Sequence, residues 1–115
     1  MNIQRIIDRE LKKGSAELVI LSLLDDEPRH GYAICSLARS RTDGVLNFYP
    51  ASLYPRLYKM EEEGWIKGQW VEKAGQRRRR FYRITPAGKK ALQAQRERWK
   101  ELFGALNRVA SLELT

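Results

Sequence analysis

The spacing of apolar residues changes twice along this chain, and the change restricts the folds that it can adopt. Up to Gly64 the apolar residues recur every three or four positions, which is the helical period. Residues 65–84 are instead rich in aromatic and β-branched side chains, a composition typical of strands. The helical period returns from Pro86 onwards. The sequence therefore predicts a set of helices, then a β-hairpin, then a long final helix.

The part before the hairpin is expected to contain four helices. Residues 2–13 have an amphipathic pattern, which Gly14 is expected to interrupt. Ser15 is a favourable N-cap for a second helix that is apolar on almost every side. A third helix is expected over residues 29–40 and a fourth over residues 50–63, ended by a glycine. The side chains expected to face the core are Tyr32, Ile34, Leu37 and Ala38 in the third helix and Leu53, Leu57 and Met60 in the fourth.

The hairpin and the last helix have clear local signals. Two strands are expected over residues 65–72 and 79–84, joined by a loop at 73–78. Thr85 is a favourable N-cap, and Pro86 suits the first helical position because the N–H that it lacks would be unpaired there anyway. The apolar positions of the final helix are Leu92, Trp99, Leu102, Phe103, Leu106 and Val109.

This order of elements predicts an α+β fold that is mainly α, a winged helix-turn-helix with an N-terminal helix and a long C-terminal helix. A chain of 115 residues suits a single domain. Residues 1–13 are expected to form the N-terminal amphipathic helix, residues 14–85 the DNA-binding domain and residues 86–115 the C-terminal helix. In such a domain the last helix of the triplet enters the major groove, and the hairpin loop reaches a neighbouring phosphate or groove.

The fourth helix carries the side chains best suited to contact DNA. Opposite its buried stripe it presents a hydroxyl, a guanidinium and an ammonium group, the donors used for base edges and phosphates. The candidates are Ser52, Pro55, Arg56 and Lys59, flanked by Tyr54 and Tyr58. The alternative is an ordinary solvated helix surface. The start of the helix is open: Pro55 is harmless if Ser52 is the N-cap, but it costs one hydrogen bond if Pro50 is the first helical residue.

The loop between the predicted strands has the densest positive charge in the chain. Arginines occupy positions 77–80 without interruption, and adjacent cations repel one another unless an anion is near. The net charge of +8 also favours a polyanionic partner. Some of these arginines are expected to face phosphate and others to pair with Glu72, and the alternative is a solubilising hairpin tip. The candidate DNA contacts in this wing are Lys73, Gln76, Arg77, Arg78 and Arg79.

Several classes of function lack support in the sequence. His30 and Cys35 do not share a helix face, so both are interpreted as structural, and no metal or cofactor is expected. No nucleophile, base and orienting group are arranged as a catalytic set, so an enzyme is not expected. No stretch approaches the roughly 20 apolar residues of a membrane span. The single cysteine suits a reducing compartment, so a cytoplasmic protein without membrane contact is expected.

Three segments of the chain resemble the PadR family of bacterial transcriptional regulators. They are HGYAI at 30–34, SLYPRLYKMEEEGWI at 52–66 and RRFYRITPAG at 79–88. Together with the apolar helix before them, they span most of the region from residue 13 to residue 92. The resemblance implies that Tyr54 and its neighbours belong to the recognition helix and that the arginines at 77–79 belong to the wing.

The resemblance also implies a homodimer in which the C-terminal helix packs against the partner subunit, often against its N-terminal helix. The residues expected at this interface are Ile3, Ile6, Ile7, Leu92, Trp99, Leu102, Phe103 and Leu106. Some members of the family stack aromatic effectors on a tryptophan of the C-terminal helix, and Trp99 is the candidate here, with plain core packing as the alternative. With a single C-terminal helix, the chain resembles the short branch of the family, which has no large effector domain.

The function expected from these features is a sequence-specific, DNA-binding transcriptional regulator. More finely, we expect a homodimeric repressor that binds a palindromic operator in double-stranded DNA and is released by a small aromatic effector. The alternative is a non-specific architectural or RNA-binding module, although RNA readers usually expose aromatics for base stacking and most aromatics here fit core positions. A further alternative is an adaptor that dimerises through its helices and shows no salt-dependent DNA binding.

Overall fold

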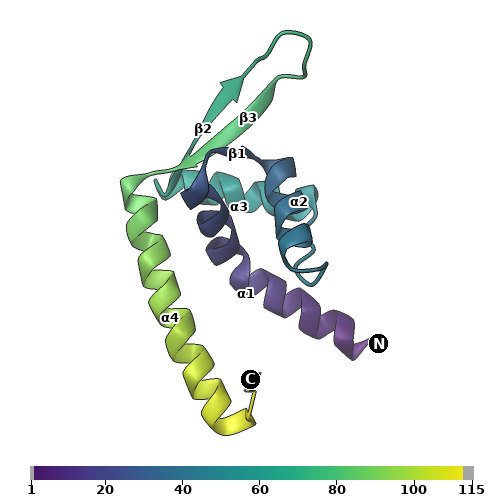
Figure 1. The fold of residues 1–115 in the computed structure, drawn as a ribbon, viewed down its shortest axis with the longest axis vertical. Coiled ribbons are helices and arrows are strands. Elements are labelled where there is room, and N and C mark those ends of the chain that lie inside the picture. The colour runs from purple at the N-terminus through teal and green to yellow at the C-terminus, as the bar shows by residue number, and fades with distance from the viewer. Residues whose placement is uncertain (1, 113–115) are drawn as a thin grey trace.

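The computed structural model describes residues 2–112 and has the expected mainly helical α+β architecture (Figure 1). A small antiparallel sheet lies beside a bundle of helices, and the N-terminal part of the first helix and most of the last helix project away from this body (Figure 1). The elements in chain order are α1 (Ile3–Asp26), β1 (Arg29–His30), α2 (Gly31–Arg41), α3 (Pro50–Glu62), β2 (Ile66–Val71), β3 (Arg79–Ile84) and α4 (Pro86–Ala110).

The break predicted at Gly14 is wrong, because α1 runs without interruption from Ile3 to Asp26. The Asn2 side chain caps its first turn by accepting a hydrogen bond from the Arg5 amide. The Ser15 hydroxyl donates to the Leu11 carbonyl oxygen at 2.8 Å and so does not cap a new helix. A glycine inside a helix costs only about 1 kcal/mol, and the turns after Gly14 bury several apolar side chains. Packing of the C-terminal half therefore outweighs the local glycine signal.

The sheet has three strands rather than the two that the sequence predicted. The additional strand β1 pairs with β3, which places His30 opposite Phe81, and the strand order is β1-β3-β2. A strand of two residues has too few positions to show a period of two, so the pattern could not reveal it. Helix α2 starts at Gly31, and the prediction that Tyr32 faces inward is wrong, since this side chain is 68% exposed. The residues of α2 in the core are Gly31, Ile34, Cys35 and Ala38.

Helix α3 begins at Pro50, which settles the open question about Pro55. Because the helix starts there, Pro55 lies inside it rather than in its first turn. The N-cap is Tyr49, whose side chain makes no capping hydrogen bond. Proline has no N–H, and the backbone bond that residue 55 would normally donate is therefore missing. Gly64, with a φ of +80°, follows the helix and lets the chain turn sharply into β2.

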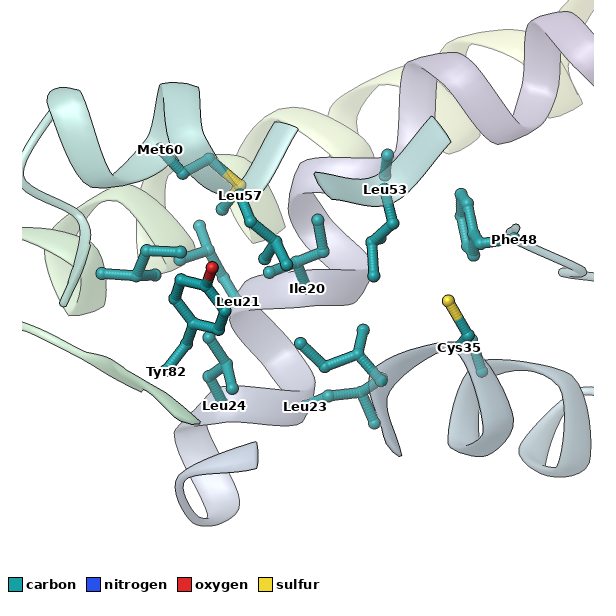
Figure 2. Close-up of a cluster of buried hydrophobic side chains, with 14 of the residues drawn as sticks. Ile20, Leu21, Leu23, Leu24, Cys35, Phe48, Leu53, Leu57, Met60 and Tyr82 are labelled. Atoms are coloured by element: carbon teal, nitrogen blue, oxygen red, sulfur yellow. The ribbon is translucent and has the colours of Figure 1, made fainter. Parts of the chain in front are cut away.

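The hydrophobic core holds α3 against α1 and the sheet (Figure 2). Leu53, Leu57 and Met60 of α3 are each about 1% exposed or less, as the predicted stripe requires. Tyr82 of β3 is fully buried and lies beside side chains of α1 in Figure 2. The cluster is completed from several elements by Ala16, Ile20, Leu21, Leu23, Leu24, Ile34, Cys35, Ala38, Phe48, Ile66 and Leu92. Within residues 2–112 no helix combines the length and apolar character needed to cross a membrane.

The junction between β3 and α4 is closely packed around Gly88. Thr85 caps α4 as predicted: its hydroxyl oxygen accepts from the Gly88 amide and donates to the Gly64 carbonyl oxygen at 2.6 Å. A Cβ atom on Gly88 would collide with the carbonyl oxygen of Trp65. This contact sets the direction in which α4 leaves the sheet.

Replacing Gly88 by alanine is expected to lower the free energy of unfolding by about 1–3 kcal/mol, because the new methyl group meets backbone and the helix must shift. Gly104→Ala in the same helix is the matched control, since a Cβ there has only the end of the Arg108 side chain nearby at 3.5 Å. The control is expected to raise stability by roughly 0.5–1 kcal/mol. Urea unfolding followed by circular dichroism measures both, and changes of the same sign would contradict the packing argument.

An ion pair ties α3 to the sheet. Glu61 accepts from Arg80 at 2.7 Å and from the backbone amide of Gly68 at 3.0 Å. Both side chains of the pair are 27% exposed, so solvent screens them only in part. Burial raises the pKa of Glu61, but the hydrogen bonds from Arg80 and Gly68 and the guanidinium charge together lower it below its ordinary value. The ionised carboxylate therefore stabilises the fold.

This linkage gives a pH dependence with a defined sign. A carboxyl group with a lowered pKa in the folded state stabilises the protein fully above its ordinary pKa, here 4.5, and the stabilisation is lost as the pH falls through the lowered value. The free energy of unfolding of the wild type is expected to exceed that of Glu61→Gln by about 1 kcal/mol near pH 7. This difference should shrink as the pH falls below 4.5. Urea unfolding at several pH values measures it, and a difference independent of pH would exclude the ion pair as the cause.

Candidate nucleic-acid interface

Helix α3 turns all six predicted contact residues away from its buried stripe. Pro55 and Lys59 are exposed and lie opposite Leu57 by helical spacing. The remaining side chains lie on the two flanks of this exposed face. Ser52 and Arg56 face α1, where they line a cavity with residues of that helix, and Tyr54 and Tyr58 line a groove beside the wing.

The flank of α3 that faces α1 is more basic than the sequence suggested. A cavity of about 240 Å³ lies between the two helices, with an apolar floor that includes Phe48. Lys12 donates to the Asn47 carbonyl oxygen at 3.1 Å and so ties α1 to the loop before α3. The cations that line the cavity are Arg9, Lys12, Lys13 and Arg56. The sequence did not predict Arg9, Lys12 and Lys13 as contacts, because the pattern of α1 drew attention only to its apolar face.

The other flank of α3 forms a groove with the wing. The groove has a volume of about 530 Å³, and its walls are lined by aromatic rings and arginines. The rings of Tyr54 and Tyr58 lie 6.2 Å apart and are tilted relative to each other. The lining residues are His30, Tyr32, Tyr54, Tyr58, Trp70, Arg77, Arg78, Arg79, Arg80 and Tyr82. The lining residues that the sequence did not predict as contacts are His30, Tyr32, Trp70, Arg80 and Tyr82.

Trp70 organises one side of the wing. Its ring is half exposed, and the guanidinium groups of Arg78 and Arg80 lie over it with distances of 4.8 and 5.8 Å to the ring centroid. Arg80 is also held by the carboxylate of Glu61, whereas the sequence analysis had suggested Glu72 as a partner for the wing arginines. The five predicted wing contacts are all exposed in or beside the loop between β2 and β3, namely Lys73, Gln76, Arg77, Arg78 and Arg79. They can therefore contact an anion.

His30 lies where α2, β1 and β3 meet, and its role goes beyond the structural one that the sequence indicated. Its Nδ1 atom caps α2 by accepting from the Ala33 amide at 3.1 Å. Its Nε2 atom lies 2.8 Å from a guanidinium nitrogen of Arg79, and the edge of its ring meets Phe81 at 5.2 Å. Burial lowers the pKa of His30, and the charge of Arg79 lowers it further. The imidazole is therefore neutral near pH 7.

The residues predicted at a dimer interface do not all lie on one surface. Leu92 is 2% exposed and belongs to the core of its own chain, and Ile6 and Trp99 are half buried. The ring of Trp99 lies 5.8 Å from that of Phe103. The large apolar side chains that α1 and α4 leave exposed are Ile3, Ile7, Leu11, Leu102, Phe103, Leu106 and Val109. An apolar stripe on two projecting helices is typical of a surface that packs against another helix.

The His, Cys, Asp and Glu side chains of residues 2–112 are dispersed rather than grouped around one point. Among residues 2–112 no three His, Cys, Asp or Glu side chains are grouped closely enough to hold a metal ion. Burial raises the pKa of the Cys35 thiol, although the nearby charge of Arg39 acts in the opposite direction. The arrangement instead offers cations, hydroxyls and aromatic faces on one side of the molecule, which is chemistry suited to a polyanion.

Comparison with known proteins agrees with this geometry. The transcriptional regulator Rv3488 of Mycobacterium tuberculosis is 33% identical over 94 residues, which cover 82% of this chain and 84% of the relative. The structure of a transcriptional regulator from Clostridium thermocellum matches with a TM-score of 0.81 at 31% identity, over 88% of this chain and 95% of that one. Bacillus subtilis PadR, solved in complex with operator DNA, matches with a TM-score of 0.64 at 25% identity, over 70% and 45%.

The family model described as the transcriptional regulator PadR-like family matches residues 20–94, which include α2, α3, the three strands and the start of α4. Proteins of this kind regulate transcription and are not enzymes. The model spans more than half of the chain, and the relatives agree with it. The chain therefore belongs to the PadR-like family of transcriptional regulators.

Proposed function

We propose that this regulator represses transcription by binding a palindromic operator in double-stranded DNA, with α3 in the major groove and the loop between β2 and β3 on the neighbouring backbone. The observation that carries the proposal is the position of α3. Its apolar stripe is locked into the core, so Pro55, Tyr58 and Lys59 can only face outward, between two basic surfaces. The structure of Bacillus subtilis PadR in complex with operator DNA supports DNA as the partner.

Two copies are needed to read a palindrome, and we propose that α1 and α4 supply the contact between them. Each helix exposes large apolar side chains, and Phe103 is 61% exposed. Burying such side chains between copies removes apolar surface from water. The recognition helices of the dimer would then meet half-sites about 34 Å apart, one turn of B-DNA.

We further propose Trp99 as the residue on which a flat aromatic effector stacks between the subunits. The half-buried Trp99 ring and the neighbouring Phe103 ring give such a ligand two faces to contact. An effector bound there would change the packing of α4 and hence the separation of the two recognition helices. As a regulator of bacterial genes, the protein would act in the cytoplasm.

The experiment that tests the central proposal compares the purified protein on DNA from upstream of its own gene with random DNA of equal length, over a series of salt concentrations. A sequence-specific regulator is expected to show steep negative salt dependence and an affinity advantage of about 10³ or more for the upstream fragment. Steep salt dependence without preference would favour an architectural or RNA-binding module. Dimers that bind no DNA even at low salt would favour the adaptor.

Arg56 and Arg78 are expected to contribute differently to binding. Arg56→Ala should weaken the free energy of binding to the preferred sequence by about 1–3 kcal/mol and reduce the discrimination between bases, because Arg56 belongs to the recognition helix. Arg78→Ala should weaken all sequences alike and lower the salt slope by about 1, because the exposed wing meets phosphate. Fluorescence anisotropy with both duplexes measures the two effects. Equal losses on upstream and random DNA for both variants would refute the division.

Phe103→Asp is expected to shift the protein towards monomers, because a charge placed in the apolar stripe of α4 cannot be buried without a partner. Ala94→Asp adds the same charge at an exposed position on the other side of the helix and should leave the dimer intact. Sedimentation velocity over a range of concentrations measures the association. A monomeric wild type, or equal effects of both variants, would refute an interface on this stripe.

A further inference from the structure

We propose that His30 and Arg79 together form a site for an anionic oxygen, and that a phosphate of the DNA backbone occupies it in the complex. The site lies at the junction of α2, β1 and β3, on the wing side of α3. Its occupant is named from the function proposed above, on which this part of the inference rests. The donors that the site offers depend on which ring nitrogen of the neutral imidazole carries its single proton.

The cap of α2 fixes that proton on Nε2. The Ala33 amide can only donate, so the Nδ1 atom of His30 must present its lone pair at 3.1 Å. A neutral imidazole carries one N–H, which must then be on Nε2. Arg79 also can only donate, and its Nη1 atom lies 2.8 Å from Nε2. Two donors therefore face each other without an acceptor between them.

The opposite placement of the proton is less favourable. With the proton on Nδ1, the imidazole could accept from Arg79, but Nδ1–H would then face the Ala33 amide. That amide belongs to the first turn of α2 and cannot turn away, and the ring is also held by its contact with Phe81. Arg79 is an exposed side chain that can rotate. The backbone cap therefore decides the tautomer, and Arg79 is the partner that moves.

The surroundings favour an anion at this point. An open pocket of about 490 Å³ beside the pair is lined by cations and holds no carboxylate among its lining residues, which are His30, Val71, Lys73, Gln76, Arg77, Arg79 and Phe81. The amino end of α2, which carries partial positive charge, is immediately adjacent. An oxygen atom that accepts from both Nε2–H and the guanidinium group would convert the opposed donors into two charge-assisted hydrogen bonds.

The wing position points to DNA as the source of the oxygen. His30 and Arg79 line the same groove as Tyr54 and Tyr58 of the recognition helix. A duplex that follows α3 would therefore pass its backbone over this pair. A backbone phosphate carries no base information, so the site should add affinity equally on any sequence.

Variants at His30 and Arg79 test the site through DNA affinity. His30→Asn keeps a good N-cap for α2 but removes the Nε2–H donor, and Arg79→Ala removes the other donor. Each substitution is expected to weaken DNA binding roughly tenfold, on upstream and random duplexes alike. Because both donors bind the same oxygen, the affinity of the double variant should fall by much less than the product of the two single losses. Arg83→Ala, an exposed arginine on the same strand, removes the same charge and should lose less. Wild-type affinity of His30→Asn, or fully multiplicative losses, would overturn the proposal.

Nuclear magnetic resonance tests the site through the His30 ring itself, without replacing that residue. The chain has one histidine, so its ring nitrogens are assigned without ambiguity. The free protein is expected to show a neutral ring with the proton on Nε2, and this signal should shift on titration with DNA in wild type but much less in Arg79→Ala. A proton on Nδ1, or a signal that DNA does not move, would overturn the inference.

A parallel titration with inorganic phosphate at constant ionic strength separates the anion site from its occupant. A shift that depends on Arg79 with both DNA and phosphate supports the whole proposal. The same shift with phosphate in a protein that binds no DNA would support the anion site while refuting the DNA source and the proposed function. Absence of a shift with both ligands would refute the site itself.

Discussion

The burial of one stripe of α3 is the constraint on which the rest of the structure depends. Leu53, Leu57 and Met60 leave water together, against α1 on one side and Tyr82 of the sheet on the other. Because the period of the helix is fixed, burying these three positions also fixes which side chains face outward. The exposed face of the recognition helix is thus determined by its hydrophobic face. A rotation of the helix would expose core residues as well as misplace Lys59.

Polar contacts then set the wing relative to α3. The carboxylate of Glu61 reaches from α3 to Gly68 on β2 and Arg80 on β3, so a single side chain joins the helix to both long strands. His30 joins α2 to β3 at the other side of the groove. These contacts involve partly buried groups, which solvent screens less than a surface pair. The groove between helix and wing is therefore held from both sides.

The sequence predicted those parts of the fold that depend on local signals. The start of α4 at Thr85 and Pro86, the bounds of β3 and the buried stripe of α3 follow from caps and periodicity, and they agree with the structure. The helix break predicted at Gly14 is wrong because the tertiary packing that stabilises α1 around this residue leaves no local signal in the sequence. The approach of His30 to Arg79 joins residues 49 positions apart, which the spacing of residues along the sequence cannot show.

The helices differ in how the backbone donors of their first turns are satisfied. Asn2, His30 and Thr85 cap α1, α2 and α4 with their side chains, whereas α3 starts at Tyr49 without such a cap. Few N–H groups are free at the start of α3, because Pro50 has none and the Ser52 amide donates to the Tyr49 carbonyl oxygen at 3.0 Å. Asn47 and Lys12 lie beside this end of α3. In the proposed complex the cations of the cavity beside α1 and the His30 site lie on opposite flanks of the recognition helix, so the two strands of the backbone on either side of the major groove would each meet donors of the protein.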